Sequence, residues 1–305
     1  MTNKNKLTNK LKQIENLTVK TNIPLKKYTT MKVGGPADFF VIPKTLKALQ
    51  KLLLKINHNI PVFIMGKGSN IIPGDKGFKG IIINMTALNK VEITDNTIKA
   101  QSGISLSTLA QKAVEHSLTG LEFAAGIPGS LGGALYMNAG AYGQEIKDVI
   151  KNCELLNLSG ETIILNKYGL KLSYRQSILQ EKKLIATKVK LKLKPGNKRK
   201  IKNSIKKLNN KRKESQPLKM ASAGSIFKRP ENNYSGKLIE EAGLKGTTVG
   251  GAQVSKKHAG FIVNLGNATA SDIKRLIRII QKKVYENSGI KLAVEPKFLG
   301  EFKYD

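Results

Sequence analysis

The sequence is poor in the residue types that build disulfides and metal sites. Its 305 residues include one cysteine and three histidines. A single cysteine, Cys153, excludes an internal disulfide, which is typical of a protein in a reducing compartment. Cys153 stands in an apolar, strand-like segment, so we expect a packed thiol. The histidines, His58, His116 and His258, are not paired at metal-ligand spacing, and the sequence therefore predicts no metal site.

Long apolar runs are also missing. None approaches the ~18–20 residues that cross a bilayer. The first ten residues, MTNKNKLTNK, contain no apolar core of a secretory signal. We therefore expect a cytoplasmic protein without a membrane partner. The chain length predicts about two domains.

Acidic residues are scarce: 21 stand against 53 lysines and arginines, a formal net charge of +32. Such a charge is compatible with nucleic-acid binding. However, the lysines are scattered, tryptophan is absent and aromatics make up 6% of the chain, so a platform for base stacking is poorly supplied. The densest basic run, 197–213, carries Ile201, Ile205 and Leu208 at helical spacing. We interpret the charge as a solvated surface and predict no nucleic-acid partner.

Hydrophobic periodicity predicts an alternation of helices and strands. Expected helices are 4–17, 45–60, 105–117, 197–213, 236–242 and one capped by Ser271. Expected strands are 39–42, 62–65, 80–85, two within 89–103, 149–157, 161–165, 184–193 and 294–302. Pro195-Gly196 suggests a boundary.

Residues 120–143 are unusual because seven of the twenty-four are glycine and only Glu122 is charged. Glycine is useful where the backbone needs φ > 0 or approaches another group closely. We interpret the segment as bare backbone around a phosphate or pyrophosphate. Tight packing of two elements is the alternative.

A second glycine turn, Gly66-Lys67-Gly68-Ser69-Asn70, follows a predicted strand. Neither turn has the P-loop pattern or the G-x-G-x-x-G dinucleotide pattern. Two such turns suit a long cofactor with a central pyrophosphate.

Further along, three polar positions stand out: Tyr174-Arg175, Ser225 and Glu295. Arginine recognises carboxylates or phosphates through two hydrogen bonds, although a surface Arg, a capping Ser and a salt-bridged Glu remain alternatives.

Several motifs along the chain occur in the same order as in a known family. They are TMKVGGPAD from Thr30, GKGSN from Gly66, GIPGSLGGA from Gly126, NAGAYG from Asn138, YR at Tyr174, GSIFK from Gly224, GGAQVSKKHAGFIVN from Gly250 and EPKFLG from Glu295. Together they closely resemble the UDP-N-acetylenolpyruvoylglucosamine reductase family. The resemblance covers about residues 20–303, and many motifs in the right order are specific.

The resemblance implies an α+β fold: a two-subdomain FAD-binding domain of the vanillyl-alcohol-oxidase (PCMH) type and a smaller C-terminal α+β substrate domain. The implied divisions are 1–31 for an N-terminal helix and lead-in, 32–197 for the FAD domain (32–88 and 89–197), and 198–305 for the substrate domain. FAD is noncovalent, and neither glycine turn carries a His or Cys for a tether. The compact C-terminal part resembles the shorter form of the family, and a monomer is expected.

The resemblance also implies the reaction, a step of peptidoglycan precursor synthesis. NADPH delivers hydride to flavin N5 and leaves. The UDP-sugar substrate then takes the place of NADPH, and hydride passes from the reduced flavin to the vinyl carbon of the substrate. Arg175 and Glu295 match positions that stabilise the enol-like intermediate, and Ser225 matches the proton donor. Substrate contacts match Tyr174, Lys228, Gln253 and Asn264. Cofactor contacts match Gly66, Lys67, Gly68, Ser69, Asn70, Gly126, Ile127, Pro128, Gly129, Ser130, Gly132, Gly133 and Asn138.

Two residues depart from the family pattern. Arg229 stands where Asn is usual, which puts one substrate contact in question, and Pro73 stands where a strand former is usual. Two other functions stay open: an FAD-dependent oxidase of a sugar or hydroxy acid on the same fold, and a basic nucleic-acid-binding protein without flavin.

Overall fold

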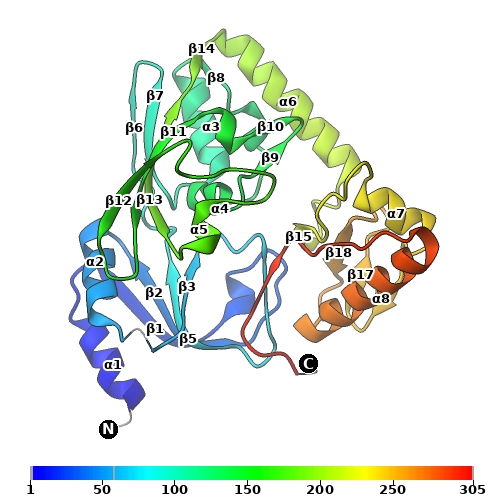
Figure 1. Ribbon diagram of the computed structural model, residues 1–305, viewed down its shortest axis with the longest axis horizontal. Coiled ribbons are helices and arrows are strands. Elements are labelled where there is room, and N and C mark those ends of the chain that lie inside the picture. The colour runs from blue at the N-terminus through cyan, green and yellow to red at the C-terminus, as the bar shows by residue number, and fades with distance from the viewer. Residues whose placement is uncertain (1–2, 58, 304–305) are drawn as a thin grey trace. The chain divides into compact units, whose positions relative to one another are not determined.

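The computed structural model describes residues 3–57 and 59–303 (Figure 1), so His58 lies outside the described residues. The chain forms two compact units that interleave in sequence. Unit 1 contains the residues up to Thr21, then Phe39–Lys67 and Gly80–Asn210. Unit 2 contains Asn22–Asp38, Gly68–Lys79 and the residues from Lys211 onward. This division differs from the three expected domains because two short N-terminal segments belong with the C-terminal part; the domain boundaries stay a prediction.

The first part of unit 1 is built on a four-stranded sheet in the order β1-β2-β5-β3. Its elements are α1 (Asn3–Lys12), β1 (Leu17–Pro24), β2 (Pro36–Pro43), α2 (Leu46–Lys55), β3 (Val62–Met65) and β5 (Phe78–Asn84). β3 and β5 are parallel, with Met65 opposite Asn84. The expected helix at 45 is confirmed: Thr45 caps α2 through its side chain, and Leu49, Leu52 and Leu53 are buried.

The second part of unit 1 is a five-stranded antiparallel sheet in the order β12-β11-β13-β7-β6. Its strands are β6 (Val91–Thr94), β7 (Thr97–Gln101), β11 (Ile150–Leu156), β12 (Thr162–Asn166) and β13 (Ile185–Lys192). α4 (Leu131–Tyr136) packs on β13, and α3 (Leu106–Glu115) packs on β8 (Leu118–Thr119) and the 3-10 helix Glu122–Ala124 (Figure 1). Smaller elements are β9 (Gly140–Ala141), β10 (Gln144–Glu145), the 3-10 helix Ile146–Asp148, α5 (Ile178–Glu181) and β14 (Lys194–Pro195). Both strand predictions within 89–103 are confirmed.

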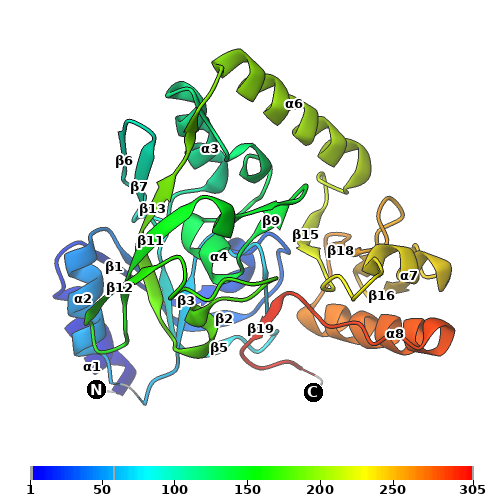
Figure 2. The ribbon, with the colours of Figure 1, turned by 45° about the horizontal axis from the view of Figure 1, so that its top comes forward.

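Unit 2 has a four-stranded sheet in the order β15-β18-β17-β16, which hydrophobic periodicity did not predict. Its strands are β15 (Ala221–Ser225), β16 (Thr248–Val249), β17 (Ala252–Val254) and β18 (Phe261–Asn264). α8 (Ala270–Ser288) packs on β16, β17 and α7 (Ser235–Glu241). Figure 2 shows α8 in orange beside α7 in yellow. The 3-10 helix Leu25–Lys27, β4 (Ile71–Pro73) and β19 (Lys297–Leu299) complete the unit, and β4 pairs in parallel with β19.

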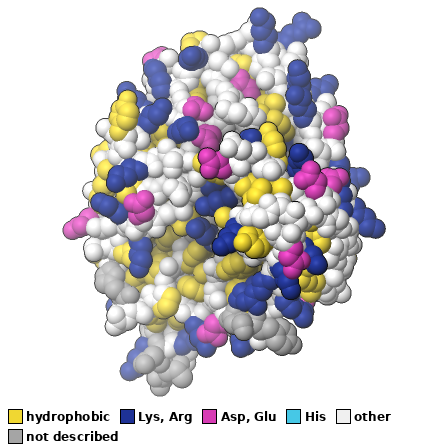
Figure 3. Space-filling view, turned by 45° about the vertical axis from the view of Figure 1, so that its right-hand side comes forward, with side chains coloured by type: hydrophobic (Ala, Val, Ile, Leu, Met, Phe, Trp, Pro, Cys, Tyr) yellow, Lys and Arg dark blue, Asp and Glu magenta, His cyan; other side chains and the backbone are white. Residues whose placement is uncertain are grey.

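α6 (Lys198–Ser215) confirms the expected basic helix, although only Ile201 of its apolar stripe is fully buried. Figure 3 shows lysine and arginine side chains spread over the face in view and fewer acidic ones. In the part of the chain that is described, no helix is both long enough and apolar enough to span a membrane.

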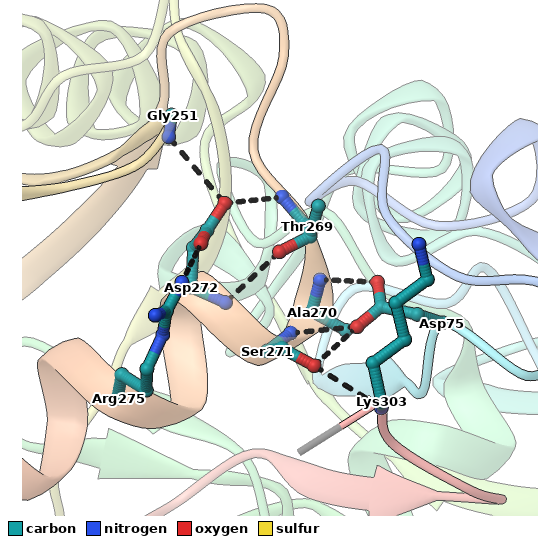
Figure 4. Close-up of polar contacts among 8 residues, drawn as sticks. All are labelled: Asp75, Gly251, Thr269, Ala270, Ser271, Asp272, Arg275 and Lys303. Atoms are coloured by element: carbon teal, nitrogen blue, oxygen red, sulfur yellow. Dashed lines mark hydrogen bonds and ion pairs between the residues drawn. The ribbon is translucent and has the colours of Figure 1, made fainter.

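The expected cap of the last helix is wrong. Thr269, not Ser271, caps α8: its side chain accepts from the Asp272 N–H at 3.0 Å, while Asp272 accepts from the Thr269 N–H at 3.0 Å (Figure 4). Ser271 lies one residue inside the helix, where its hydroxyl donates to Asp75 at 2.5 Å. Both Thr and Ser can cap, and only the reciprocal pair with Asp272 selects Thr269.

Candidate functional site

Within unit 1, Gly66 of the first glycine turn lies close to Ser130 of the second. Gly66 directly follows β3, and Ser130 caps α4 by accepting from the Gly133 N–H at 3.4 Å. A Cβ built on Gly66 would stand 2.0 Å from Ser130 Oγ, and one on Gly132 would stand 2.9 Å from Ser102 Cβ. A side chain at either position would require its neighbour to shift, so glycine permits the close approach seen here.

Asn84 fixes the Gly66 turn from the neighbouring strand, and sequence reasoning missed it. Asn84 is 4% exposed, and its Nδ2 donates to the Gly66 carbonyl at 3.1 Å. Its Oδ1 accepts from the Thr86 N–H at 3.2 Å. The available signal was a polar residue ending the apolar run GIIIN, at the carboxyl end of a strand parallel to β3.

The rest of this turn, Gly68–Asn70, belongs to unit 2. Gly68 has φ 65°, a conformation that glycine adopts without strain. Its carbonyl accepts from the Thr30 N–H at 3.2 Å, and the Asn70 carbonyl accepts from the Lys297 N–H at 2.9 Å. Within unit 2, the turn is thus tied to the segment before β2 and to β19.

Tyr174 and Arg175 are the central residues of a tight turn in unit 1. Ser173 and Gln176 exchange backbone hydrogen bonds of 3.1 and 3.3 Å across it. Arg175 has φ 56°, a left-handed conformation that costs a non-glycine residue of order 1–2 kcal/mol. Gln180 holds the strained position by donating to the Arg175 carbonyl at 3.0 Å, and the guanidinium lies 4.9 Å from the Tyr174 ring centroid. A strained, externally held arginine is typical of a functional position.

Asn138 supports the same turn. It is fully buried, and its Nδ2 donates to Glu145 Oε2 at 3.1 Å and to the Ser173 carbonyl at 3.0 Å. Its Oδ1 accepts from the Lys147 N–H at 3.0 Å. Since both amide hydrogens are used inside the protein, a cofactor contact through this amide would have to replace one of these bonds.

Unit 2 brings Ser225 and Glu295 onto neighbouring segments. The Glu295 N–H donates to the Ile226 carbonyl at 2.9 Å, and Phe227 bridges to Val294. Ser225 follows a bulge in β15, where Gly224 has φ 78° and no atom lies within 4 Å of its Cβ position. Ser225 Oγ donates to the Phe227 carbonyl at 3.0 Å. Ser225 itself is half-buried.

The predicted substrate residues of unit 2 differ in how far they are engaged. The Lys228 N–H donates to the Ala293 carbonyl at 2.8 Å, which places Lys228 in the strand pair that joins the segments of Ser225 and Glu295. Gln253 Nε2 donates to Thr248 Oγ1 at 3.0 Å. Asn264 is 7% exposed and donates to the Met31 carbonyl at 3.0 Å while accepting from the Gly266 and Ala268 N–H groups.

Both departures from the family pattern have a structural explanation. The Arg229 guanidinium stacks on the Tyr234 ring at 4.1 Å, and its Nε donates to the Asn233 carbonyl at 3.3 Å. Pro73 ends β4, opposite Leu299 in a two-stranded ladder, where a missing N–H costs little.

Burial shifts the pKa values of Cys153, Tyr136 and His258, and raises that of the Tyr136 hydroxyl. Burial raises the pKa of the Cys153 thiol far above its usual value, which confirms the packed thiol. Burial also lowers the pKa of His258, whose Nδ1 accepts from the Gly260 N–H at 3.1 Å. Among the described residues, no group of three or more His, Cys, Asp or Glu side chains could hold a metal.

The chain matches two family models. Residues 37–166 match an FAD binding domain, and residues 216–299 match the C-terminal domain of UDP-N-acetylenolpyruvoylglucosamine reductase. A protein of Caldanaerobacter subterraneus subsp. tengcongensis with the name of that reductase is 47% identical over 297 residues, covering 97% of this chain and 98% of its own. The chain belongs to the UDP-N-acetylenolpyruvoylglucosamine reductase family.

Two further comparisons agree. The reductase of Lactococcus lactis subsp. cremoris is 44% identical over 292 residues, covering 95% of this chain and 98% of its own. The crystal structure of the reductase from Thermus caldophilus matches with a TM-score of 0.82 at 34% identity, covering 93% of this chain and 99% of the other. They confirm the expected fold: an FAD-binding domain followed by this family's C-terminal domain.

The glycine turns fit the cofactor of this family. Gly66 and Gly132 admit no Cβ. Neither 66–70 nor 126–133 contains an acidic residue, which suits an anionic pyrophosphate near backbone N–H groups. Neither turn contains a His or Cys that could tether a flavin. The residues present thus suit noncovalent FAD.

Proposed function

We propose that the chain reduces UDP-N-acetylenolpyruvoylglucosamine to UDP-N-acetylmuramate with electrons from NADPH. The observation that carries the proposal is the placement of Ser225 and Glu295 on bonded neighbouring segments, in a chain of this family. When bound, FAD supplies the two-electron chemistry, taking a hydride from NADPH and giving it to the terminal vinyl carbon. The double bond then needs one proton at the adjacent carbon.

Ser225 supplies that proton in this proposal. A hydroxyl is a weak acid, and it can protonate only a strongly basic, carbanion-like carbon, which hydride addition produces here. The Ser225 hydrogen points to the Phe227 carbonyl at 3.0 Å. Rotation about the Cβ–Oγ bond would redirect this hydrogen toward the substrate carbon.

Arg175 and Glu295 stabilise the negative charge that reaches the substrate carboxylate. A guanidinium held in place before reaction contributes most when charge develops in the transition state. The backbone of Arg175 is held by the turn of Ser173 and Gln176 and by Gln180, and its guanidinium lies 4.9 Å from the Tyr174 ring centroid. Glu295 can donate a hydrogen bond to this carboxylate only when it carries or shares a proton.

The remaining contacts are also proposals. Tyr174, Lys228, Gln253 and Asn264 contact the UDP-sugar. Residues 66–70 and 126–133, with Asn138, contact FAD. We further propose that the enzyme acts as a cytoplasmic monomer without nucleic-acid or membrane partners.

The test is a visible spectrum of the purified protein followed by half-reaction kinetics. We expect flavin bands that NADPH bleaches and the enolpyruvyl substrate restores. Ser225→Ala should slow reoxidation by substrate by about 10²-fold or more, as for loss of a general acid, while reduction by NADPH survives. Ser222→Ala, in the same strand, is the matched control. A flavoprotein that NADPH cannot reduce would favour a sugar or hydroxy-acid oxidase of the same fold, and a colourless protein that FAD cannot reconstitute would refute both.

A further inference from the structure

The motif that begins at Thr30 has no role in the reaction described so far, yet its first residue connects two candidate site segments. The Thr30 N–H donates to the Gly68 carbonyl at 3.2 Å. The Thr30 hydroxyl donates to the Ser222 carbonyl at 2.7 Å, across 192 residues of sequence. Thr30 thus binds the middle of the glycine turn through its N–H and the strand that carries Ser225 through its hydroxyl.

The segment around Thr30 is itself firmly anchored in unit 2. Met31 is fully buried in the core of this unit, together with Val33. The Met31 carbonyl accepts from Asn264 Nδ2 at 3.0 Å. A neighbouring threonine, Thr29, is buried as well, but its hydroxyl donates to the Val33 carbonyl at 3.2 Å, inside the same loop. Of these two hydroxyls, only that of Thr30 reaches β15.

We propose that Thr30 is a positioning residue that couples occupation of the Gly66–Asn70 turn to the strand of the proton donor. A ligand that orders Gly68 restrains the Thr30 backbone, and the Thr30 hydroxyl passes that restraint to Ser222, three residues before Ser225. The proposal rests on the proposed function, because it takes FAD as the ligand of the turn. In this way the first motif fixes the donor strand when the cofactor is bound.

The bulge in β15 lies between the residue that Thr30 binds and the proton donor. The register of β15 against β18 shifts between Ser222 and Ser225, and beyond the shift Ser225 pairs again, opposite Phe261. Gly224, at φ 78°, adds backbone freedom just before the donor. Ser222 is the last paired residue before the bulge, opposite Val263, and the Thr30 hydroxyl binds its carbonyl.

The test is amide hydrogen exchange of the whole protein with and without saturating FAD. Thr30→Val removes the hydroxyl but keeps the N–H to Gly68, Thr30→Ser keeps both, and Thr29→Val is the matched control. In the wild type, we expect FAD to slow exchange in 66–70 and to slow exchange in 221–225 by about fivefold or more. In Thr30→Val, protection of 66–70 should remain while protection of 221–225 falls below about twofold. Thr29→Val and Thr30→Ser should behave as the wild type.

The outcomes separate the inference from the proposed function. If FAD does not protect 66–70 in the wild type, the cofactor assignment of the turn fails, and this inference fails with it. If FAD protects 66–70 but not 221–225, or protects both equally in Thr30→Val, the cofactor site stands and the positioning role of Thr30 is overturned. Half-reactions give a second readout: Thr30→Val should slow reoxidation by substrate about tenfold, as for a misplaced reacting group, and leave reduction by NADPH unchanged.

Discussion

The carboxylate of Asp75 joins segment 68–79 to α8, and its removal should destabilise unit 2. Asp75 Oδ1 accepts from the Ala270 N–H at 2.8 Å, and Oδ2 accepts from the Ser271 N–H at 2.9 Å and the Ser271 hydroxyl at 2.5 Å (Figure 4). The Lys303 N–H donates to the same hydroxyl at 3.3 Å, so the C-terminal segment is part of the cluster.

The expected magnitude follows from these contacts. A hydrogen bond to a charged group contributes about 1.5–3 kcal/mol, and a negative charge at a helix N-terminus about 0.3–1 kcal/mol. Three such bonds are not additive, because Asp75 is half-buried and water replaces part of what is lost. Thr269 and Asp272 also continue to cap α8. For Asp75→Ala, we therefore expect a loss of about 3 kcal/mol in the free energy of unfolding.

The assay is urea unfolding followed by circular dichroism, because the chain has no tryptophan. Asp95→Asn is the control, since it removes one negative charge from an exposed turn, and it should change stability by less than about 0.5 kcal/mol. The stability loss of Asp75→Asn should lie between those of Asp75→Ala and Asp95→Asn, because the amide keeps one acceptor and places a donor against the Ser271 N–H. Equal midpoints for Asp75→Ala and Asp95→Asn would refute the reasoning.

Three further predictions concern the site and its surroundings. Gly66→Ala should abolish FAD binding in a flavin-fluorescence titration because the new Cβ would stand 2.0 Å from Ser130 Oγ; adding Ser130→Ala should restore part of it, and an unaffected single variant would contradict the close approach. Arg175→Lys should lower kcat by about 10²-fold with the flavin spectrum unchanged, and wild-type kcat would remove Arg175 from the mechanism. The lowered pKa of His258 means that this histidine binds a proton less readily in the folded state than in the unfolded state. The neutral histidine therefore contributes its full stability above the unfolded pKa of ~6.5, and this stability is lost as the pH falls from there toward the folded pKa. His258→Gln, which keeps an acceptor for the Gly260 N–H, should flatten the loss of stability measured by denaturation from pH 7 to 5, and an unchanged slope would contradict this cause.

Elements with strong periodicity were predictable from the sequence. α2 and α3 carry apolar residues at helical spacing behind a capping Thr or Ser, and β3 is a short apolar run between Pro61 and a glycine. The sheet of unit 2 was not predictable by the same logic. β15 reads Ala-Ser-Ala-Gly-Ser and contains no β-branched residue, so it is a strand only because β18 pairs with it.

The candidate site divides in the same way. Glycine-rich turns and isolated Arg, Ser and Glu residues could be recognised as unusual, and the family resemblance supplied their expected roles. The sequence marks Asn84 as a polar strand end and Thr30 as the start of a motif, but not what they do, because both bind backbone carbonyls that are distant in sequence. A single sequence contains no information on which carbonyl a buried hydroxyl or amide reaches.

The interleaving of the two units has a consequence for synthesis of the protein. Met31 is buried in the core of unit 2, and its carbonyl binds Asn264, which lies 233 residues later. At about 5–20 residues per second, translation delivers that partner roughly 10–50 s after Met31 has been made. During this interval the segment around Met31 leaves the ribosome with an apolar surface that no native partner can cover. Unit 2 therefore cannot fold as its own C-terminal part emerges unless the N-terminal segments have stayed accessible, and a fragment that begins at Lys211 would lack part of its core.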